Sequence, residues 1–371
     1  MPHVKPEIES FAKIKVVGVG GSGKNAVNHM VESKVRGVEF IAINTDAQDL
    51  HQSLAHRKIR IGKELTKGLG TGMNPELGRQ SAEETKEEIQ EALKGADMVF
   101  ITCGMGGGTG TGASAVVAQT AKMNGALTIG VVTRPFVFEG AERARLAEAG
   151  LMRLRDAVDA LIVIPNDKLL SVISKETPFL SAFAMCDEVL KNAVRGISEL
   201  ITKPGVINVD FADVRAIMQN AGSALMGIGY GRGEFRAEDA AKAAINSPLL
   251  DISINGAKGV LFAISGGKDL TMWEIQEAAK IITSSIDADA KVIFGAIEDM
   301  GLKKGEVKIT VIASGFPGNG NSKMRTLFAP DSRKDQRNSG QGDQKDLSAD
   351  GGESHDPELD SIPAFLRRQK K

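Results

Sequence analysis

Residues 13–32 have the sequence KIKVVGVGGSGKNAVNHMVE. A short β-branched run, Lys13–Val19, leads into a turn that holds four glycines between Gly18 and Gly23, and the helical pattern of Asn25–Glu32 follows. This succession predicts a buried parallel strand, a tight turn and a helix. It is the unit from which nucleotide-binding α/β sheets are built.

The alternation of strand and helix patterns continues through the first half of the chain. Further strands are expected at Phe40–Asn44, Asp97–Cys103, Leu127–Thr133 and Leu161–Ile164, and further helices at Pro75–Leu93, Gly112–Met123 and Glu139–Arg155. We therefore predict an α/β fold with a doubly wound, mostly parallel sheet. Ligands of such sheets bind at the carboxyl ends of the strands.

A long central helix is expected at Phe179–Thr202, with Thr177 and Pro178 at its start and Lys203-Pro204-Gly205 as its stop. The pattern beyond it predicts a smaller α+β domain. Its strands are expected at Ser223–Gly229, Lys258–Ser265, Lys291–Ile297 and Glu306–Ser314, and its helices at Ala237–Asn246 and Thr271–Ser284.

The composition narrows the class of protein. A length of 371 residues suggests about two domains. With 46 basic and 47 acidic residues, the net charge of -1 speaks against a nucleic-acid partner. Cys103 and Cys186 stand too far apart for a disulfide framework, which suggests a reducing cytoplasm. Without a secretory signal or an apolar run of about 18 residues, we expect no direct membrane insertion.

The chain changes character after Phe316. Gly, Asn, Ser, Asp, Gln and Lys dominate up to about His355, too few apolar side chains to offset the entropy of ordering, so a disordered linker is expected. Apolar and basic residues follow in Asp360–Lys371. This end is either unstructured or a peptide that orders on a partner.

Three interpretations of the first glycine loop stay open on its own residues. Gly18, Gly20 and Gly23, with Asp46 about 20 residues later, satisfy the dinucleotide fingerprint, which would indicate an NAD-dependent oxidoreductase. The same loop nearly matches a P-loop ending in Lys24, but Asn25 replaces the Ser or Thr that would bind Mg²⁺. The third is a turn that binds nothing.

The second loop, residues 104–112, reads GMGGGTGTG and lies between an expected strand and an expected helix. Consecutive glycines leave backbone N–H groups accessible at a helix N-terminus, and Thr109 and Thr111 add hydroxyl groups. Two such loops predict a di- or triphosphate held from two sides. An NAD enzyme would not need the second loop.

The motif GGGTGTG of this loop resembles the signature of the tubulin and FtsZ superfamily of polymerising GTPases. The similarity spans roughly Phe11–Phe316 and returns in the C-terminal peptide, and it is strongest to the cell-division branch of the superfamily. Lys24 stands where that branch commonly has glycine. Further matching motifs are Asn25–Asn28, Asn44–Asp46, Asn74–Pro75, Gly78–Arg79, Thr133–Phe136, Glu139–Gly140, Arg143 and Pro165–Asp167.

The resemblance implies that GTP or GDP binds between the loops together with Mg²⁺. The implied nucleotide contacts are Gly20, Gly21, Ser22, Gly23, Lys24, Asn25, Gly104, Met105, Gly107, Gly108, Thr109, Gly110, Thr133, Pro135, Glu139, Arg143, Asn166, Phe183 and Asp187. Locally, Glu139 and Arg143 could be a surface ion pair, and Asn166 and Asp187 a cap and a solvated acid. In the family these last two positions select guanine, while the ring at Phe183 stacks on the base.

The resemblance assigns Asn208, Asp210 and Asp213 to a catalytic synergy loop that enters the nucleotide site of the next subunit. Judged locally, Asp210 could simply cap a helix with Asp213 in its first turn. The implied division of the chain is 1–12, a flexible segment; 13–178, a Rossmann-like GTP-binding domain; 179–203, the central helix; 204–316, the α+β domain; 317–358, a disordered linker; and 359–371, a partner-binding peptide.

The implied function is a GTPase that polymerises head to tail into a cytokinetic ring at the bacterial division site, in the cytoplasm at mid-cell. Its implied partners are copies of itself and, through Asp360–Arg368, membrane-tethering and regulatory division proteins. One alternative is a nucleotide-gated structural filament whose turnover is incidental. The NAD-dependent oxidoreductase is the other, and it leaves the second loop without a role.

Overall fold

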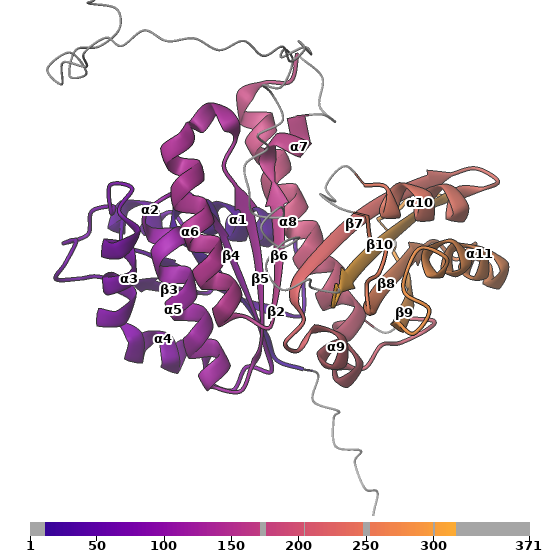
Figure 1. Cartoon of the computed structure of the whole chain (residues 1–371), viewed down its shortest axis with the longest axis horizontal. Coiled ribbons are helices and arrows are strands. Elements are labelled where there is room, and N and C mark those ends of the chain that lie inside the picture. The colour runs from indigo at the N-terminus through magenta and orange to yellow at the C-terminus, as the bar shows by residue number, and fades with distance from the viewer. Residues whose placement is uncertain (1–11, 171–175, 204, 248–252, 300, 317–371) are drawn as a thin grey trace, which may run out of the picture. The chain divides into compact units, whose positions relative to one another are not determined.

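The computed structural model describes residues 12–170, 176–203, 205–247, 253–299 and 301–316. These residues form a ten-stranded sheet in the order β3-β2-β1-β4-β5-β6-β7-β10-β8-β9 (Figure 1). Its first six strands are all parallel. They are β1 (Ile14–Val19), β2 (Val38–Asn44), β3 (Arg57–Arg60), β4 (Met98–Gly104), β5 (Leu127–Arg134) and β6 (Ala160–Pro165). The order 3-2-1-4-5-6 is that of dinucleotide-binding sheets, with the reversal between β1 and β4.

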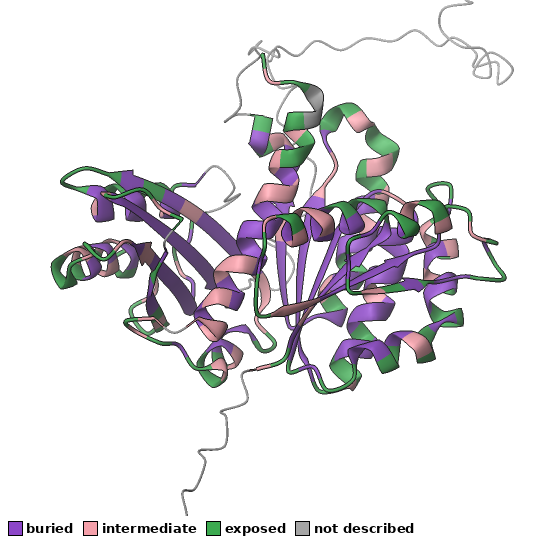
Figure 2. Ribbon diagram, turned by 180° about the vertical axis from the view of Figure 1, so that it is seen from behind, coloured by how far each residue is buried: buried purple, intermediate pink, exposed green. Residues whose placement is uncertain are grey.

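Helices cover both faces of this parallel part. The elements are α1 (Gly20–Glu32), α2 (Ala47–His51), α3 (Pro75–Glu84), α4 (Lys86–Leu93), α5 (Thr109–Met123), the 3₁₀ turn η1 (Val137–Glu139), α6 (Ala141–Ala157), α7 (Asn166–Leu170) and α8 (Phe179–Thr202). Alternate strand residues enter two different cores: Val16 packs with α1 and α8, and Val17 packs with α3 to α6. The strands are therefore buried on both sides, while the outer helix faces are exposed (Figure 2).

The second half of the chain extends the same sheet. Its elements are α9 (Phe211–Met218), β7 (Gly222–Arg232), α10 (Arg236–Ile245), β8 (Gly259–Gly266), α11 (Met272–Thr283), β9 (Lys291–Glu298) and β10 (Glu306–Ser314). Strand β10 runs antiparallel to β7 and β8, and a third apolar core lies under α10 and α11. A short parallel pairing that starts with Ala160 and Gly222 joins β6 to β7. The predicted α/β class with an α+β second part is confirmed, whereas the domain boundaries stay predictions.

Helix α8 connects the two ends of the parallel strands. It has 24 residues and so a length of about 36 Å. Near its start, Phe183 contacts Phe136, which follows the carboxyl end of β5. At its other end, a Cβ on Gly37, just before β2, would lie 2.8 Å from the Thr202 hydroxyl oxygen. The predicted long helix thus runs from the carboxyl ends of the strands to their amino ends.

Several element boundaries differ from those predicted. Helices α1 and α5 begin at Gly20 and Thr109, so residues expected in loops form their first turns. The single helix expected at Pro75–Leu93 is two helices, because Thr85 leaves the helical conformation with φ -108° and ψ 20°. The expected helix Glu139–Arg155 begins only at Ala141, after η1.

Parts of the predicted organisation lie outside the described residues. These are most of the N-terminal segment 1–12, the linker 317–358 and the peptide 359–371. In the part of the chain that the structure describes, no helix combines the length and the apolar character needed to span a bilayer.

Candidate functional site

The two glycine loops lie side by side at the carboxyl ends of β1 and β4, where the strand order reverses. The backbone N–H of Gly104 donates to the Ser22 hydroxyl oxygen at 2.7 Å. A Cβ on Gly20 would lie 2.9 Å from the backbone nitrogen of Gly110. Gly20 also has a φ of +72°, which favours glycine. The fold therefore brings both loops together at the place where such sheets bind ligands.

Gly21 and Gly107 are glycines that the protein itself does not require. Around Gly107, no described atom lies within 4 Å of the position that a Cβ would take. For a Cβ on Gly21, the Asp49 carboxylate is the one group of the described residues that comes near, at an ordinary contact distance of 3.7 Å. Neither has a positive φ. Space is thus left open on both loops at backbone that a bound group could approach.

Helices α1 and α5 begin in a way that suits an anion. Neither has a side-chain cap, and neither has an acidic residue in its first turn. By contrast, α2, α9 and α11 are capped by Asp46, Asp210 and Thr271. The first N–H groups of a helix need partners from outside, and the helix dipole favours negative charge there. The two loops present two such helix ends to a phosphate chain.

The polar side chains of the loops are largely occupied by the protein. The hydroxyl of Thr109 lies 2.9 Å from that of Thr45 and 3.2 Å from that of Thr71. Thr111, expected to face phosphate, accepts instead from the backbone N–H of Gly106 at 2.9 Å. The Lys24 ammonium donates to Asp49 at 2.6 Å and is buried. Backbone N–H groups are therefore the donors that these contacts leave most accessible to a phosphate chain.

Glu139 and Arg143 form the ion pair that their spacing allows. Arg143 donates from Nη1 to Glu139 Oε2 at 2.7 Å, and Glu139 accepts with its other oxygen from the backbone N–H of Phe136 at 3.0 Å. A Cβ on Gly106 would lie 2.8 Å from the Arg143 carbonyl oxygen and 3.3 Å from Pro135. Glu139 and Arg143 therefore form an ion pair with each other and also lie directly beside the second glycine loop.

Helix α8 adds an aromatic ring and a carboxylate to this edge. The Phe183 ring meets that of Phe136 edge to face, with centroids 5.4 Å apart. Asp187 follows one helical turn later, and burial raises the pKa of its carboxyl to about 7. Burial also raises the pKa of the neighbouring Cys186 thiol to about 12, which suits a packing residue and not a nucleophile.

Asn166 begins α7 directly after β6 and is buried. Its side-chain oxygen Oδ1 has no hydrogen-bond partner among the described residues. An unsatisfied buried acceptor is unusual in a folded protein and points to a missing donor. Asn166 thus belongs with the carboxyl-edge residues.

The predicted nucleotide contacts lie at this edge of the fold, at different depths. The buried ones are Gly20, Gly23, Lys24, Met105, Gly108, Thr109, Gly110, Thr133 and Asn166. Partly buried are Gly104, Gly107, Pro135, Glu139, Arg143 and Asp187, and exposed are Gly21, Ser22, Asn25 and Phe183.

Asn208, Asp210 and Asp213 are not brought to this site. They follow the far end of α8, and all three are exposed. Arg215, which like Asp213 lies on α9, donates to the carbonyl of Gly125, which precedes the amino end of β5. Figure 1 shows α7 and α9 at opposite ends of the parallel strands. As the local interpretation predicted, Asp210 caps α9 by accepting from the backbone N–H of Ala212 at 3.1 Å.

Comparison with known proteins identifies the family. A model of the Tubulin/FtsZ family GTPase domain matches residues 13–174, and a model of the FtsZ family C-terminal domain matches residues 222–317. A solved structure of an empty FtsZ dimer from M. jannaschii is 49% identical, with 83% of this chain and 89% of that chain covered and a TM-score of 0.79. The chain belongs to the FtsZ family. It is a tubulin-like GTPase, and GTP is the nucleotide that its GTPase domain implies.

Two further structures are similar to this FtsZ-family chain. A point mutant of M. jannaschii FtsZ is 49% identical, with 82% of this chain and 92% of that chain covered and a TM-score of 0.79. CetZ2 from Haloferax volcanii, solved as a protofilament with bound GTPγS, is 22% identical. The match covers 85% of this chain and 96% of the CetZ2 chain, with a TM-score of 0.71. At that identity the likeness concerns the fold alone.

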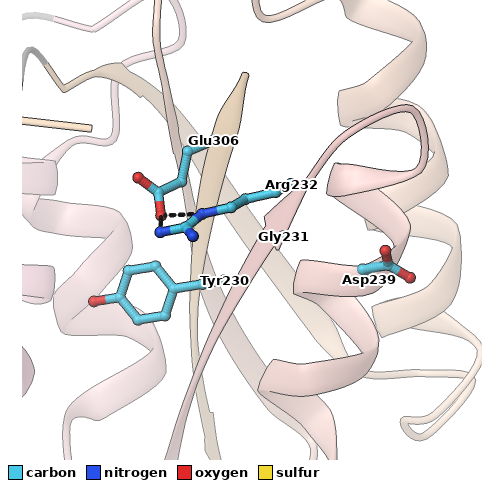
Figure 3. Close-up of a pocket in the computed structure, with 5 residues that line it drawn as sticks. All are labelled: Tyr230, Gly231, Arg232, Asp239 and Glu306. Carbon is cyan, nitrogen blue, oxygen red and sulfur yellow. Dashed lines mark hydrogen bonds and ion pairs between the residues drawn. The ribbon is translucent and has the colours of Figure 1, made fainter. Parts of the chain in front are cut away.

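A separate hollow of about 530 Å³ lies in the second half of this FtsZ-family chain (Figure 3). It is lined by Tyr230, Gly231, Arg232, Asp239 and Glu306. Arg232 donates to Glu306 from Nε at 3.0 Å and from Nη2 at 2.7 Å, so its charge is already paired. None of the predicted nucleotide contacts lines this hollow.

Three further residues contact the loops although the sequence analysis gave them no role at the site: Thr45, which lies in the matching motif Asn44–Asp46, and Asp49 and Thr71. Their contacts with the loops join residues distant in sequence, so no local pattern predicts these pairings. As for metals, the described residues contain no group of three or more His, Cys, Asp or Glu side chains placed to hold an ion. A Mg²⁺ ion held mainly by nucleotide phosphates and water needs no such cage.

Proposed function

We propose that this chain polymerises head to tail into filaments that form the cytokinetic ring at the bacterial division site, and that it hydrolyses GTP at the interface between adjacent subunits. One observation carries the proposal. The glycine loops lie at the carboxyl ends of the parallel strands, and the Asn208–Asp213 segment lies at their amino ends. The length of α8 separates the two. One chain cannot bring its own carboxylates to its own loops, whereas a second copy stacked end to end can.

The phosphates of GTP are assigned to the space between the loops. The open backbone at Gly21 and Gly107 and the uncapped starts of α1 and α5 support this placement. The Glu139–Arg143 pair, beside the second loop, is assigned to the ribose. Mg²⁺ would be held by the phosphates at this edge and would offset their charge.

Guanine is assigned to the surface formed by Phe183, Asp187 and Asn166. An ionised Asp187 can accept hydrogen bonds from the N1–H and the exocyclic amine of guanine, an arrangement that adenine does not offer. The Asn166 oxygen, which is buried and has no hydrogen-bond partner among the described residues, supplies a further acceptor. Phe183, which already packs edge-on against Phe136, offers a ring to the base. These three residues favour GTP over ATP.

Hydrolysis is assigned to the acidic end of the neighbouring subunit, which is its segment Asn208–Asp213. Asp210 and Asp213 lie three residues apart at the start of α9, are exposed, and would position the attacking water, with Asn208 beside them. Each site is then incomplete until a second chain supplies these groups. Loss of the γ-phosphate would change the interface itself, so the nucleotide state would control filament stability.

Assembly of this chain is supported by its relatives. The M. jannaschii FtsZ, at 49% identity, was solved as a dimer. We assign the filament to the cytoplasm at mid-cell. Membrane-tethering and regulatory division proteins are assigned to the peptide Asp360–Arg368, which lies outside the described residues. Deleting Asp360–Lys371 should spare GTPase activity and abolish binding to the tether.

Mixing two inactive variants tests the shared site. Gly107→Val damages the nucleotide end, and Asp213→Ala damages the acidic end. Each alone should release little phosphate, but an interface between an Asp213→Ala nucleotide end and a Gly107→Val acidic end is intact, so the mixture should recover turnover. Gly107→Val mixed with Asp187→Ala, both damaged at the nucleotide end, is the control and should stay inactive. Failure of the first mixture to exceed its components would refute the shared site.

A further inference from the structure

A continuous chain of buried and partly buried polar contacts links the two glycine loops. Lys24, in the first turns of α1, donates to Asp49 Oδ1 at 2.6 Å, and Asn44 donates to Asp49 Oδ2 at 2.7 Å. The Asn44 side-chain oxygen accepts from the backbone N–H of Thr45 at 2.9 Å, and the hydroxyl of Thr45 meets that of Thr109 at the start of α5. These contacts thus begin at the first loop and end at the second.

Asp49 stands where a negative charge would oppose nucleotide binding. Its Oδ2 lies 3.7 Å from the position that a Cβ would take on Gly21, which is the open side of the first loop. An unneutralised carboxylate there would repel a phosphate chain that approached the same backbone. The ammonium of Lys24, with a side chain only 6% exposed, is what offsets that charge.

We propose that Lys24 is a positioning residue that favours nucleotide binding through Asp49: it neutralises the carboxylate beside the first loop and holds it away from the phosphates. This inference rests on the proposed placement of the phosphates between the loops. It differs from the sequence-based expectation, in which Lys24 itself contacts the nucleotide. In the structure the Lys24 ammonium lies 2.6 Å from Asp49 Oδ1, and its side chain is only 6% exposed, so little of it is accessible to a phosphate.

Removing one or both charges separates these two roles. The probe is GDP with Mg²⁺, titrated calorimetrically into nucleotide-free full-length protein well below its unfolding temperature. Lys24→Met, which keeps most of the buried volume, should raise the Kd about tenfold or more because Asp49 is then uncompensated. In the double variant Lys24→Met/Asp49→Asn, both charges are absent and the Asn44 hydrogen bond has an acceptor, so the Kd should return to within about threefold of native.

Asp49→Asn alone gives a second measurement if Lys24→Met does not fold. It removes the repulsive charge and frees the cation, so GDP should bind at least as tightly as to the native chain. Lys63→Met is the matched control, since Lys63 pairs with Glu88 at 2.9 Å in an exposed ion pair. It should leave the Kd unchanged.

A double variant as weak as Lys24→Met would overturn the inference and make Lys24 a direct ligand. Weaker binding by Asp49→Asn would overturn it too, because the pair would then act only as structural support. Gly107→Val, measured alongside, tests the phosphate placement itself. If Gly107→Val binds GDP like the native chain, the proposed site fails together with this inference. If it does not bind and the double variant shows no rescue, only the inference fails.

Discussion

Asp187 follows Phe183 by one turn of α8, so the carboxylate and the ring lie on the same face of the helix. That face meets Phe136 at the carboxyl edge of the sheet. Burial of the carboxylate in this setting raises its pKa to about 7. The group assigned to guanine therefore changes its charge within the physiological pH range.

Nucleotide affinity should depend on pH through Asp187. Only the ionised carboxylate accepts from both guanine N–H groups, so below pH 7 binding must first remove a proton. The Kd for GDP should rise by about tenfold for each pH unit below 7 and level off above it. Calorimetric titrations between pH 5.5 and 8.5 measure this. Asp187→Asn, which does not titrate, should show no such step, and a native Kd that is constant or falls at low pH contradicts the assignment.

The raised pKa of Asp187 should also make the stability of the nucleotide-free protein depend on pH. The pKa of Asp187 is higher folded than unfolded, so the folded state binds the proton more tightly and stability is lost as pH rises from about 4 to 7. Asp187→Asn removes this cost. Thermal unfolding should find the variant more stable than native at pH 8 and equal to it at pH 4. Equal unfolding temperatures at pH 8 would argue that the carboxylate is well solvated.

Gly107 and Gly112 should respond differently to a side chain, although they belong to one motif. A Cβ on Gly112 would overlap the carbonyl oxygen of Pro75, so Gly112→Ala should destabilise the fold by about 1–3 kcal/mol. Gly107 faces open space, so Gly107→Val should unfold close to the native temperature. It should nevertheless weaken GDP binding at least about tenfold, since hydrogen bonds to charged groups contribute roughly 1.5–3 kcal/mol each. If Gly107→Val bound GDP with native affinity, the result would contradict the assignment of a phosphate to this loop.

Asp210 and Asp213 should be separable into capping and catalysis. Asp210 caps α9, so Asp210→Ala should lower stability by about 1 kcal/mol, whereas Asp210→Asn keeps the cap. If both acids serve hydrolysis, Asp210→Asn and Asp213→Ala should keep GTP binding and native stability but lose turnover. Urea unfolding and phosphate release on the same samples check this. Full turnover in Asp210→Asn would leave that residue a cap only.

The sequence indicates the parallel sheet well because its strands are buried on both faces. β1, β4 and β5 are mostly apolar and almost entirely buried, and turn residues follow them, which is the pattern of a buried parallel strand. β3 was missed because Arg57–Arg60 contains three basic residues and one apolar residue. The break at Thr85 was missed too, since neither Gly nor Pro marks it. The pairing of β6 with β7, which makes one sheet of the two halves, depends on contacts distant in sequence.

The candidate site could be predicted only as far as its backbone. The glycine loops lie where the strand order places them, because the fold dictates which strand ends meet. What each side chain does there was less accessible. Lys24 follows the loop in sequence, yet it pairs with Asp49, 25 positions later, and Thr111 turns to its own loop. These choices depend on which partners tertiary structure brings near.

Phosphate release from GTP with Mg²⁺, measured per chain over a range of protein concentrations, tests the central claim most directly. A site completed by a neighbouring subunit predicts negligible turnover per chain at low concentration and a steep rise once a threshold is passed. The same threshold should appear for filaments in sedimentation. Turnover per chain that is constant from the lowest concentration upward would show a self-contained site and would contradict hydrolysis at the interface.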